Sequence, residues 1–171
     1  MGKPAPGRPV AAALLDTSFL ITLLDRTRKS HATAVGCFRL WTASGVVLYA
    51  STIVIAEYTA RGALHDYILR WLRILPFGYH HAIKSGSLTA AQIAARDGGT
   101  WPASEESRYA VRNDVKLFAQ AHESGAALLA TDDRGMMALA GFFKERGLIG
   151  FDILPPWLPF DETMALGRRR G

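Results

Sequence analysis

Short apolar runs alternate with longer amphipathic segments along most of the chain. Runs that are rich in valine, leucine and isoleucine and bounded by turn residues are typical of buried strands. They occupy residues 10–15, 46–50, 74–77, 126–130 and 151–154. The segments between them are long enough for helical crossovers, which join parallel strands. We therefore predict an α/β fold in which a parallel β-sheet of four to five strands is flanked by helices on both faces.

Amphipathic periodicity and turn signals predict the helices between these runs. The first helix is expected to begin just after Asp16, with Thr17 or Ser18 as its N-cap, and Ser51 or Thr52 is expected to cap the helix after the second run. Gly86 is expected to break the helical region that follows the third run. The other predicted helices cover residues 31–44, 64–73, 82–95 in two pieces, 103–123 and 136–146.

The length of 171 residues fits one domain. Residues 11–160 are predicted to form it, between a flexible basic N-terminal segment (1–10) and a basic C-terminal tail (161–171). The single cysteine, Cys37, excludes an intrachain disulfide and a multi-cysteine metal site, and its helical setting predicts a buried thiol. No apolar stretch is long enough for a membrane span or a signal-peptide core, so we expect a cytoplasmic protein.

Carboxylates follow two of the predicted strands directly. Asp16 ends the first run, and Asp132 and Asp133 follow the fourth. The carboxyl ends of strands in an open α/β sheet are where ligands bind. The alternative for each acid is a structural one, because aspartate also caps helices and is favoured at their N-termini.

Two further acids interrupt apolar faces of predicted helices. Asp114 lies in a stripe with Leu117 and Ala121, and Glu57 shares a face with Ile53. An ionised carboxylate is rarely buried without a partner. Asp114 is therefore either a surface residue paired with a neighbouring cation, Arg112 or Lys116, or a carboxylate at the edge of the sheet. Glu57 is either solvated or part of the same site.

Convergence of these acids would need a cation, because clustered carboxylates repel one another. An all-oxygen site suits Mg²⁺ or Mn²⁺. Such an ion lowers the pKa of a bound water and orients it on a phosphodiester. The net charge of +5 and pI of 9.7 favour a polyanionic partner, and Arg61, Lys116 and Arg134 are candidate basic residues at the rim of the site.

Four motifs together resemble the PIN-domain family, and most closely the VapC-type toxin ribonucleases. They are Leu14-Leu15-Asp16-Thr17-Ser18, Thr52-Ile53-Val54-Ile55-Ala56-Glu57-Tyr58 with Gly62, Asn113-Asp114, and Leu129-Ala130-Thr131-Asp132-Asp133-Arg134. The resemblance covers about residues 11–154 and implies that 11–160 is a PIN-like nuclease domain. It implies a Mg²⁺- or Mn²⁺-dependent endoribonuclease that acts on RNA, is usually dimeric, and in toxin members is bound by a small antitoxin.

The resemblance also implies roles for individual residues. Asp16, Glu57, Asp114 and Asp133 match the four acids that are both catalytic and metal-binding, and Asp133 takes the fourth place because the family pattern is Thr-x-Asp from Thr131. Asp132 is then expected to face outward or to cap the helix at 136–146. The chain departs from the family pattern at Met136-Met137, where an aromatic residue is usual, and in the greater length of residues 84–107.

Two other functions remain possible on sequence grounds. One is a catalytically silent PIN-like module that binds RNA or a protein, although a degenerate member would be expected to lack one of the four acids. The other is a phosphoacceptor receiver domain, which also uses strand-end aspartates. Asp16 is followed by Thr17 rather than by a second acid, so this reading is disfavoured.

Overall fold

The computed structural model describes residues 12–99 and 108–157. The N-terminal segment 1–10, the C-terminal tail 161–171 and the predicted beginning of a helix at 103–107 lie outside the described residues. In the described part of the chain, no helix is long and apolar enough to cross a membrane.

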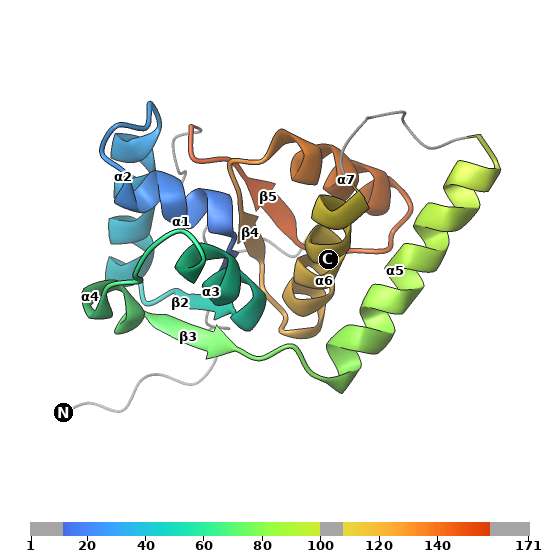
Figure 1. The fold of residues 1–171 in the computed structure, drawn as a ribbon, viewed down its shortest axis with the longest axis horizontal. Coiled ribbons are helices and arrows are strands. Elements are labelled where there is room, and N and C mark those ends of the chain that lie inside the picture. Colours follow the sequence, from blue (N-terminus) through green and yellow to red (C-terminus); the bar gives the residue numbers. More distant parts are fainter. Residues whose placement is uncertain (1–11, 100–107, 158–171) are drawn as a thin grey trace.

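A five-stranded parallel sheet forms the centre of the domain and confirms the predicted fold class (Figure 1). Its strand order is β3-β2-β1-β4-β5. The strands are β1 (Ala12–Leu15), β2 (Val47–Ser51), β3 (Leu72–Leu75), β4 (Leu128–Ala130) and β5 (Asp152–Leu154). In the register of the central strands, Leu14 pairs with Tyr49 on one side and Leu129 on the other.

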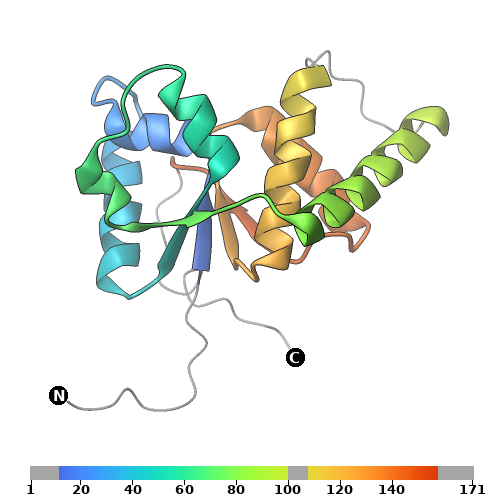
Figure 2. The same cartoon turned by 60° about the horizontal axis from the view of Figure 1, so that its bottom comes forward.

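Helices cover both faces of the sheet, as Figures 1 and 2 show from two directions. The described helices are α1 (Thr17–Leu24), α2 (His31–Ala43), α3 (Thr52–Thr59), α4 (Asp66–Leu69), α5 (Tyr79–Asp97), α6 (Arg108–Glu123) and α7 (Arg134–Glu145). The helices α1–α4 lie on one side, and α6 and α7 on the other. Helix α5 packs along α6 and extends beyond the sheet (Figure 2).

Three local predictions were wrong. The segment 64–73 holds only the short α4, because Leu72 and Arg73 instead pair with β2 as the first residues of β3. Helix α5 continues through Gly86, where packing against α6 outweighs the cost of about 1 kcal/mol for a helical glycine. The N-cap of α1 is Asp16 rather than Thr17 or Ser18, whereas Ser51 caps α3 as predicted.

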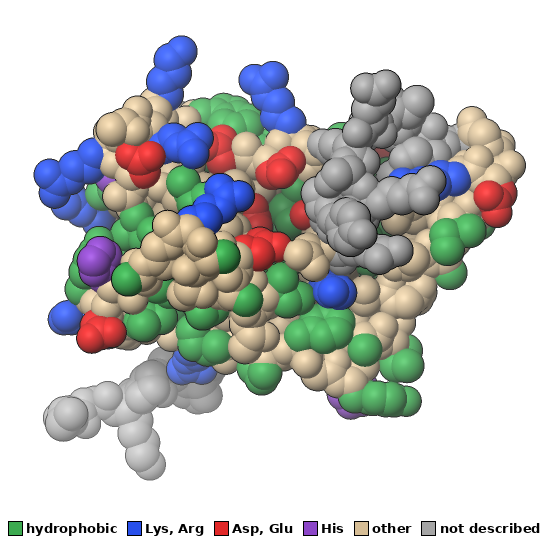
Figure 3. Space-filling model, in the orientation of Figure 1, with side chains coloured by type: hydrophobic (Ala, Val, Ile, Leu, Met, Phe, Trp, Pro, Cys, Tyr) green, Lys and Arg blue, Asp and Glu red, His purple; other side chains and the backbone are tan. Residues whose placement is uncertain are grey.

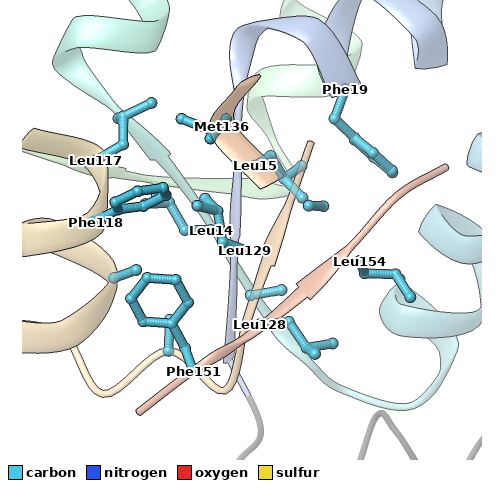
Figure 4. Close-up of a cluster of buried hydrophobic side chains, with 14 of the residues drawn as sticks. Leu14, Leu15, Phe19, Leu117, Phe118, Leu128, Leu129, Met136, Phe151 and Leu154 are labelled. Carbon is cyan, nitrogen blue, oxygen red and sulfur yellow. The ribbon is translucent and has the colours of Figure 1, made fainter. Parts of the chain in front are cut away.

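The core lies on both sides of the central strands (Figure 4). All four residues of β1 and all three of β4 are buried, which explains why their sequences are apolar runs rather than alternating patterns. Phe118 on α6 contacts the rings of Phe143 and Phe151, with centroid distances of 5.9 and 5.8 Å. These contacts fix α6 against α7 and the β5 edge. Cys37 is buried, as predicted, and is not part of a disulfide.

Candidate functional site

The site is built where the chain leaves the two central strands in opposite directions. From β1 the chain enters α1 on one face of the sheet, and from β4 it enters α7 on the other face (Figure 1). This is a topological switch point, at which ligands of open α/β sheets bind. The backbone N–H of Asp16 donates to the carbonyl of Ala130 (2.9 Å), so the residues that follow the two strands are held side by side.

Asp16 is a buried carboxylate at this point, with 6% of its surface exposed. Its Oδ2 accepts hydrogen bonds from the Ser18 hydroxyl (2.6 Å), the Thr131 hydroxyl (2.9 Å) and the Ser18 backbone N–H (3.2 Å). Burial raises the pKa of Asp16 above its ordinary value, and these hydrogen bonds oppose that shift without cancelling it. A cation bound beside this carboxyl would therefore stabilise its charged form, which burial disfavours.

Glu57 on α3 is held between two helices. Its Oε2 accepts a hydrogen bond from the Thr17 hydroxyl on α1, and its Oε1 accepts one from the Asn113 side-chain amide on α6, both at 2.6 Å. The Lys116 ammonium lies 3.5 Å from the Asn113 side-chain oxygen. Because lysine only donates, this contact turns the amide nitrogen of Asn113 toward Glu57.

The two acids after β4 differ from their predicted arrangement in which of them caps α7 and in the inward position of Asp132. Asp133, not Asp132, is the N-cap of α7, and its Oδ1 accepts from the backbone N–H groups of Gly135 (2.7 Å) and Met136 (3.1 Å). Asp132 accepts a hydrogen bond from the buried Thr22 hydroxyl at 2.8 Å. The prediction that Asp132 would face outward or cap the helix was wrong, because a Thr-x-Asp spacing does not say which of two adjacent carboxylates reaches the helix N-terminus.

The capping role of Asp133 leads to a stability prediction. Asp133→Ala is expected to lower the free energy of unfolding by about 1 kcal/mol, whereas Asp133→Asn should leave it nearly unchanged, because asparagine caps as well as aspartate. Chemical denaturation of the two variants beside the wild type measures the difference. Equal stability of the alanine and asparagine variants would contradict the role of the side chain as a cap.

The acids line one cavity of about 560 Å³. Asp16, Glu57, Asp114 and Asp133, the four predicted site residues, all line it, together with Asp132. The other lining residues are Thr17, Ser18, Ile21, Thr22, Arg28, Ala60, Arg61 and Asn113. Figure 3 shows acidic side chains gathered in a hollow of this face, with basic side chains close by. Of the three predicted rim cations, Arg61 lines the cavity, whereas Lys116 contacts Asn113 and Arg134 is exposed on α7.

The donor chemistry of this cavity fits a hydrated divalent ion. Among residues 12–99 and 108–157, no three histidine, cysteine, aspartate or glutamate side chains are grouped closely enough to hold a metal by themselves. Mg²⁺ usually keeps several waters and takes only one or two protein carboxylates. A cavity lined by carboxyl and hydroxyl oxygens, among them those of the buried Asp16, meets that requirement.

Several residues of the site were not predicted as site residues from the sequence. Ser18, Thr131 and Asn113 belong to the quoted motifs, but their hydrogen bonds to the acids are visible only in the folded chain. Arg28 had no sequence signal, because it lies in a charged loop between α1 and α2 that resembles any solvated loop.

Comparison with known proteins identifies the fold. No protein-family model and no curated protein matches the chain. Among solved structures, VapBC2 from Rickettsia felis bound to a DNA fragment from its promoter matches with a TM-score of 0.54 and 18% identity, over 84% of this chain and 98% of the other. DNA-bound VapBC from Salmonella typhimurium matches with a TM-score of 0.53 and 19% identity, over 85% and 98% of the two chains.

A third similar structure is Mycobacterium tuberculosis VapC20, described as a Sarcin-Ricin loop cleaving toxin. Its TM-score is 0.50 and its identity 20%, over 74% of this chain and 93% of that one. At these identities the likenesses establish the fold. The described part of the chain has the PIN-like fold that these VapBC and VapC structures share.

Proposed function

We propose that this chain, with its PIN-like fold, is a Mg²⁺- or Mn²⁺-dependent endoribonuclease that hydrolyses phosphodiester bonds within RNA. The observation that carries the proposal is the cavity at the switch point, into which helices α3 and α6 and the ends of β1 and β4 bring five acidic side chains. A purely structural set of caps and surface acids has no reason to converge in this way, since like charges repel.

Asp16, Glu57, Asp114 and Asp133 are the residues proposed to bind the hydrated metal ion, one or two of them directly and the others through its waters. A bound divalent ion would supply a water of lowered pKa and neutralise charge that develops on the phosphate. The side chains of this chain would orient that site. Ser18 and Thr131 fix the Asp16 carboxylate, and the hydrogen bonds of Glu57 leave it spanning α1 and α6.

A toxin role is the more specific part of the proposal. Two of the similar structures are VapBC assemblies, and the third is described as a Sarcin-Ricin loop cleaving toxin. We infer that this chain acts in the cytoplasm as the toxin of a toxin–antitoxin pair, as a homodimer, and that a small antitoxin protein binds it.

The proposed function is tested by cleavage of a defined RNA pool. With Mg²⁺ or Mn²⁺, the wild type should cut single-stranded or loop RNA internally, and EDTA should stop the reaction. Asp114→Asn keeps the shape of the side chain and removes its charge, so it should reduce the rate at least about 100-fold, above the loss typical of outer-shell ligands. Asp97→Asn, an exposed acid at the end of α5, is the matched control and should cleave like the wild type.

Both variants must first melt cooperatively, so that a loss of activity reports on the site. Equal cleavage by Asp114→Asn and the wild type would identify a contaminating nuclease. The catalytically silent binding module would then be the better description of the chain.

The same assay separates the two acids after β4. Asp133→Asn preserves the cap of α7 while removing a charge from the cavity. If Asp133 is the fourth ligand, this variant should lose cleavage without losing stability, and Asp132→Asn should retain more activity. The reverse order of activities would transfer the role to Asp132.

A further inference from the structure

The wall of the acidic cavity also contains two arginines. Arg28 comes from the loop between α1 and α2, and Arg61 from the turn after α3. The sequence suggests Arg61 as a rim residue, but it gives no reason to select Arg28 from its neighbours Arg26 and Lys29. Of these three loop cations, the fold brings only Arg28 to the cavity.

Hydrogen bonds hold the backbone on both sides of Arg28. Asp25 Oδ1 accepts hydrogen bonds from the backbone N–H of Thr27 (2.9 Å) and from its hydroxyl (2.6 Å), and the Arg28 N–H donates to the Asp25 carbonyl (3.1 Å). The His31 N–H then donates to the Arg28 carbonyl (3.0 Å). The loop is therefore a hydrogen-bonded turn, which fixes the backbone position of Arg28 beside the cavity.

The guanidinium of Arg28 remains available to an incoming anion. Its Nε lies 3.6 Å from Asp25 Oδ2, and the two side chains are 53% and 42% exposed. Ion pairs this exposed contribute little. The lowered pKa of Asp25 arises first from its hydrogen bonds to Thr27, with Arg28 a smaller cause. Within the described residues, Asp25 is the one acid that forms an ion pair with Arg28.

We propose that Arg28, together with Arg61, binds a backbone phosphate of the RNA strand beside the phosphodiester that the acids act on, and is therefore a positioning residue. The proposal rests on the proposed ribonuclease function. A cavity lined by five acids repels a polyanion, and cations at its wall reverse the field for the approaching strand. Arginine suits this role because its planar fork donates two parallel hydrogen bonds to a phosphate.

The test measures binding separately from cleavage. In an Asp114→Asn background, a fluorescein-labelled single-stranded RNA of mixed sequence is titrated at several salt concentrations. Adding Arg28→Ala should weaken binding about fivefold to tenfold. It should also lower the slope of log K against log salt by about 0.7, the value for one phosphate contact to a single strand. Arg26→Ala, two residues away and outside the cavity, is the matched control and should change neither quantity appreciably.

Two more variants separate charge from geometry. Arg28→Lys should restore the salt slope but only part of the affinity, because an ammonium is a point charge without the fork. Asp25→Asn keeps an acceptor for Thr27 and removes the competing charge, so it should strengthen binding. In the cleaving enzyme, Arg28→Ala should raise KM while kcat stays within about twofold, as for an interaction made equally in the ground and transition states.

The outcomes distinguish this inference from the function it rests on. If the wild type cleaves RNA while Arg28→Ala and Arg26→Ala give the same affinity and salt slope, the role of Arg28 is overturned and the ribonuclease stands. If the unsubstituted protein neither cleaves nor binds the RNA, both proposals are wrong. A fall in kcat with KM unchanged would also overturn the positioning role, because it would place Arg28 in the chemical step.

Discussion

Asp16→Asn is expected to abolish RNA cleavage and, at the same time, to leave the domain as stable as the wild type or more stable. Loss of a proposed metal ligand should reduce the rate at least about 100-fold. The stability effect has the opposite sign because burial disfavours the charged form of Asp16, as its raised pKa shows. Asparagine has no charge to desolvate, retains an acceptor oxygen for Ser18 and Thr131, and is an equally good N-cap for α1.

The pH dependence of that difference follows from linkage. A carboxyl whose pKa is higher in the folded than in the unfolded chain binds its proton more tightly when folded, so its unfavourable contribution exists above the folded pKa and disappears as the pH falls through it. The Tm advantage of Asp16→Asn should therefore be largest at neutral pH and shrink on acidification. Calorimetry in EDTA, which removes divalent ions, measures this with Asp97→Asn as the control. An Asp16→Asn variant that melts below the wild type at neutral pH would contradict the argument.

Phe118→Ala is expected to produce the largest loss of stability. Phe118 is fully buried and packs against Phe143 on α7 and Phe151 before β5, so its truncation leaves a cavity among three elements. Such substitutions cost about 3–5 kcal/mol. At about 2–4 °C per kcal/mol for a domain of this size, the Tm should fall by about 6–20 °C.

The surface residue Tyr79 provides the control for this prediction. Its side chain is 74% exposed, so Tyr79→Ala should change stability by no more than about 0.5 kcal/mol. Thermal unfolding of both variants measures the contrast. A Phe118→Ala variant as stable as Tyr79→Ala would mean that α6 is not held through this side chain. Because Asp114 lies on the same helix, the Phe118 variant should also cleave more slowly well below its Tm.

The central strands could be predicted because their burial on both faces leaves a direct trace in the sequence. Leu14 and Leu129 stand in runs with no polar alternation. Asp16 follows the first run directly, and Asp132 follows the other after Thr131. The edge strand β3 was predicted only in part, at 74–77 instead of Leu72–Leu75. Its first two residues, Leu72 and Arg73, fit the end of the predicted helix 64–73 equally well, and pairing with β2 places them in the strand.

The convergence of the acids on one cavity could be predicted for a similar reason, whereas the identity of the helix cap could not. Strand ends and interrupted apolar stripes direct attention to Asp16, Glu57 and Asp114, which the fold brings to one cavity. Which acid caps a helix depends on the angle at which the chain leaves β4, and that angle is set by packing. The assignment of a cap to Asp132 failed on this point, and Arg28 was missed because its place depends on the whole α1–α2 turn.

The placement of β4 between β1 and β5 has a consequence for a chain still being synthesised. The acid set is completed by residues that follow β4, late in the sequence, whereas Asp16 and Glu57 emerge early. Domains generally fold as units, with N-terminal parts made first. While β4 is still inside the ribosome, the emerged part of the chain lacks Asp132 and Asp133. Strand β1 then has no β4 beside it, and Asp16 has no hydrogen bond from Thr131. If the protein cuts RNA, the ribosome that makes it is therefore not exposed to the finished site until the residues after β4 have emerged.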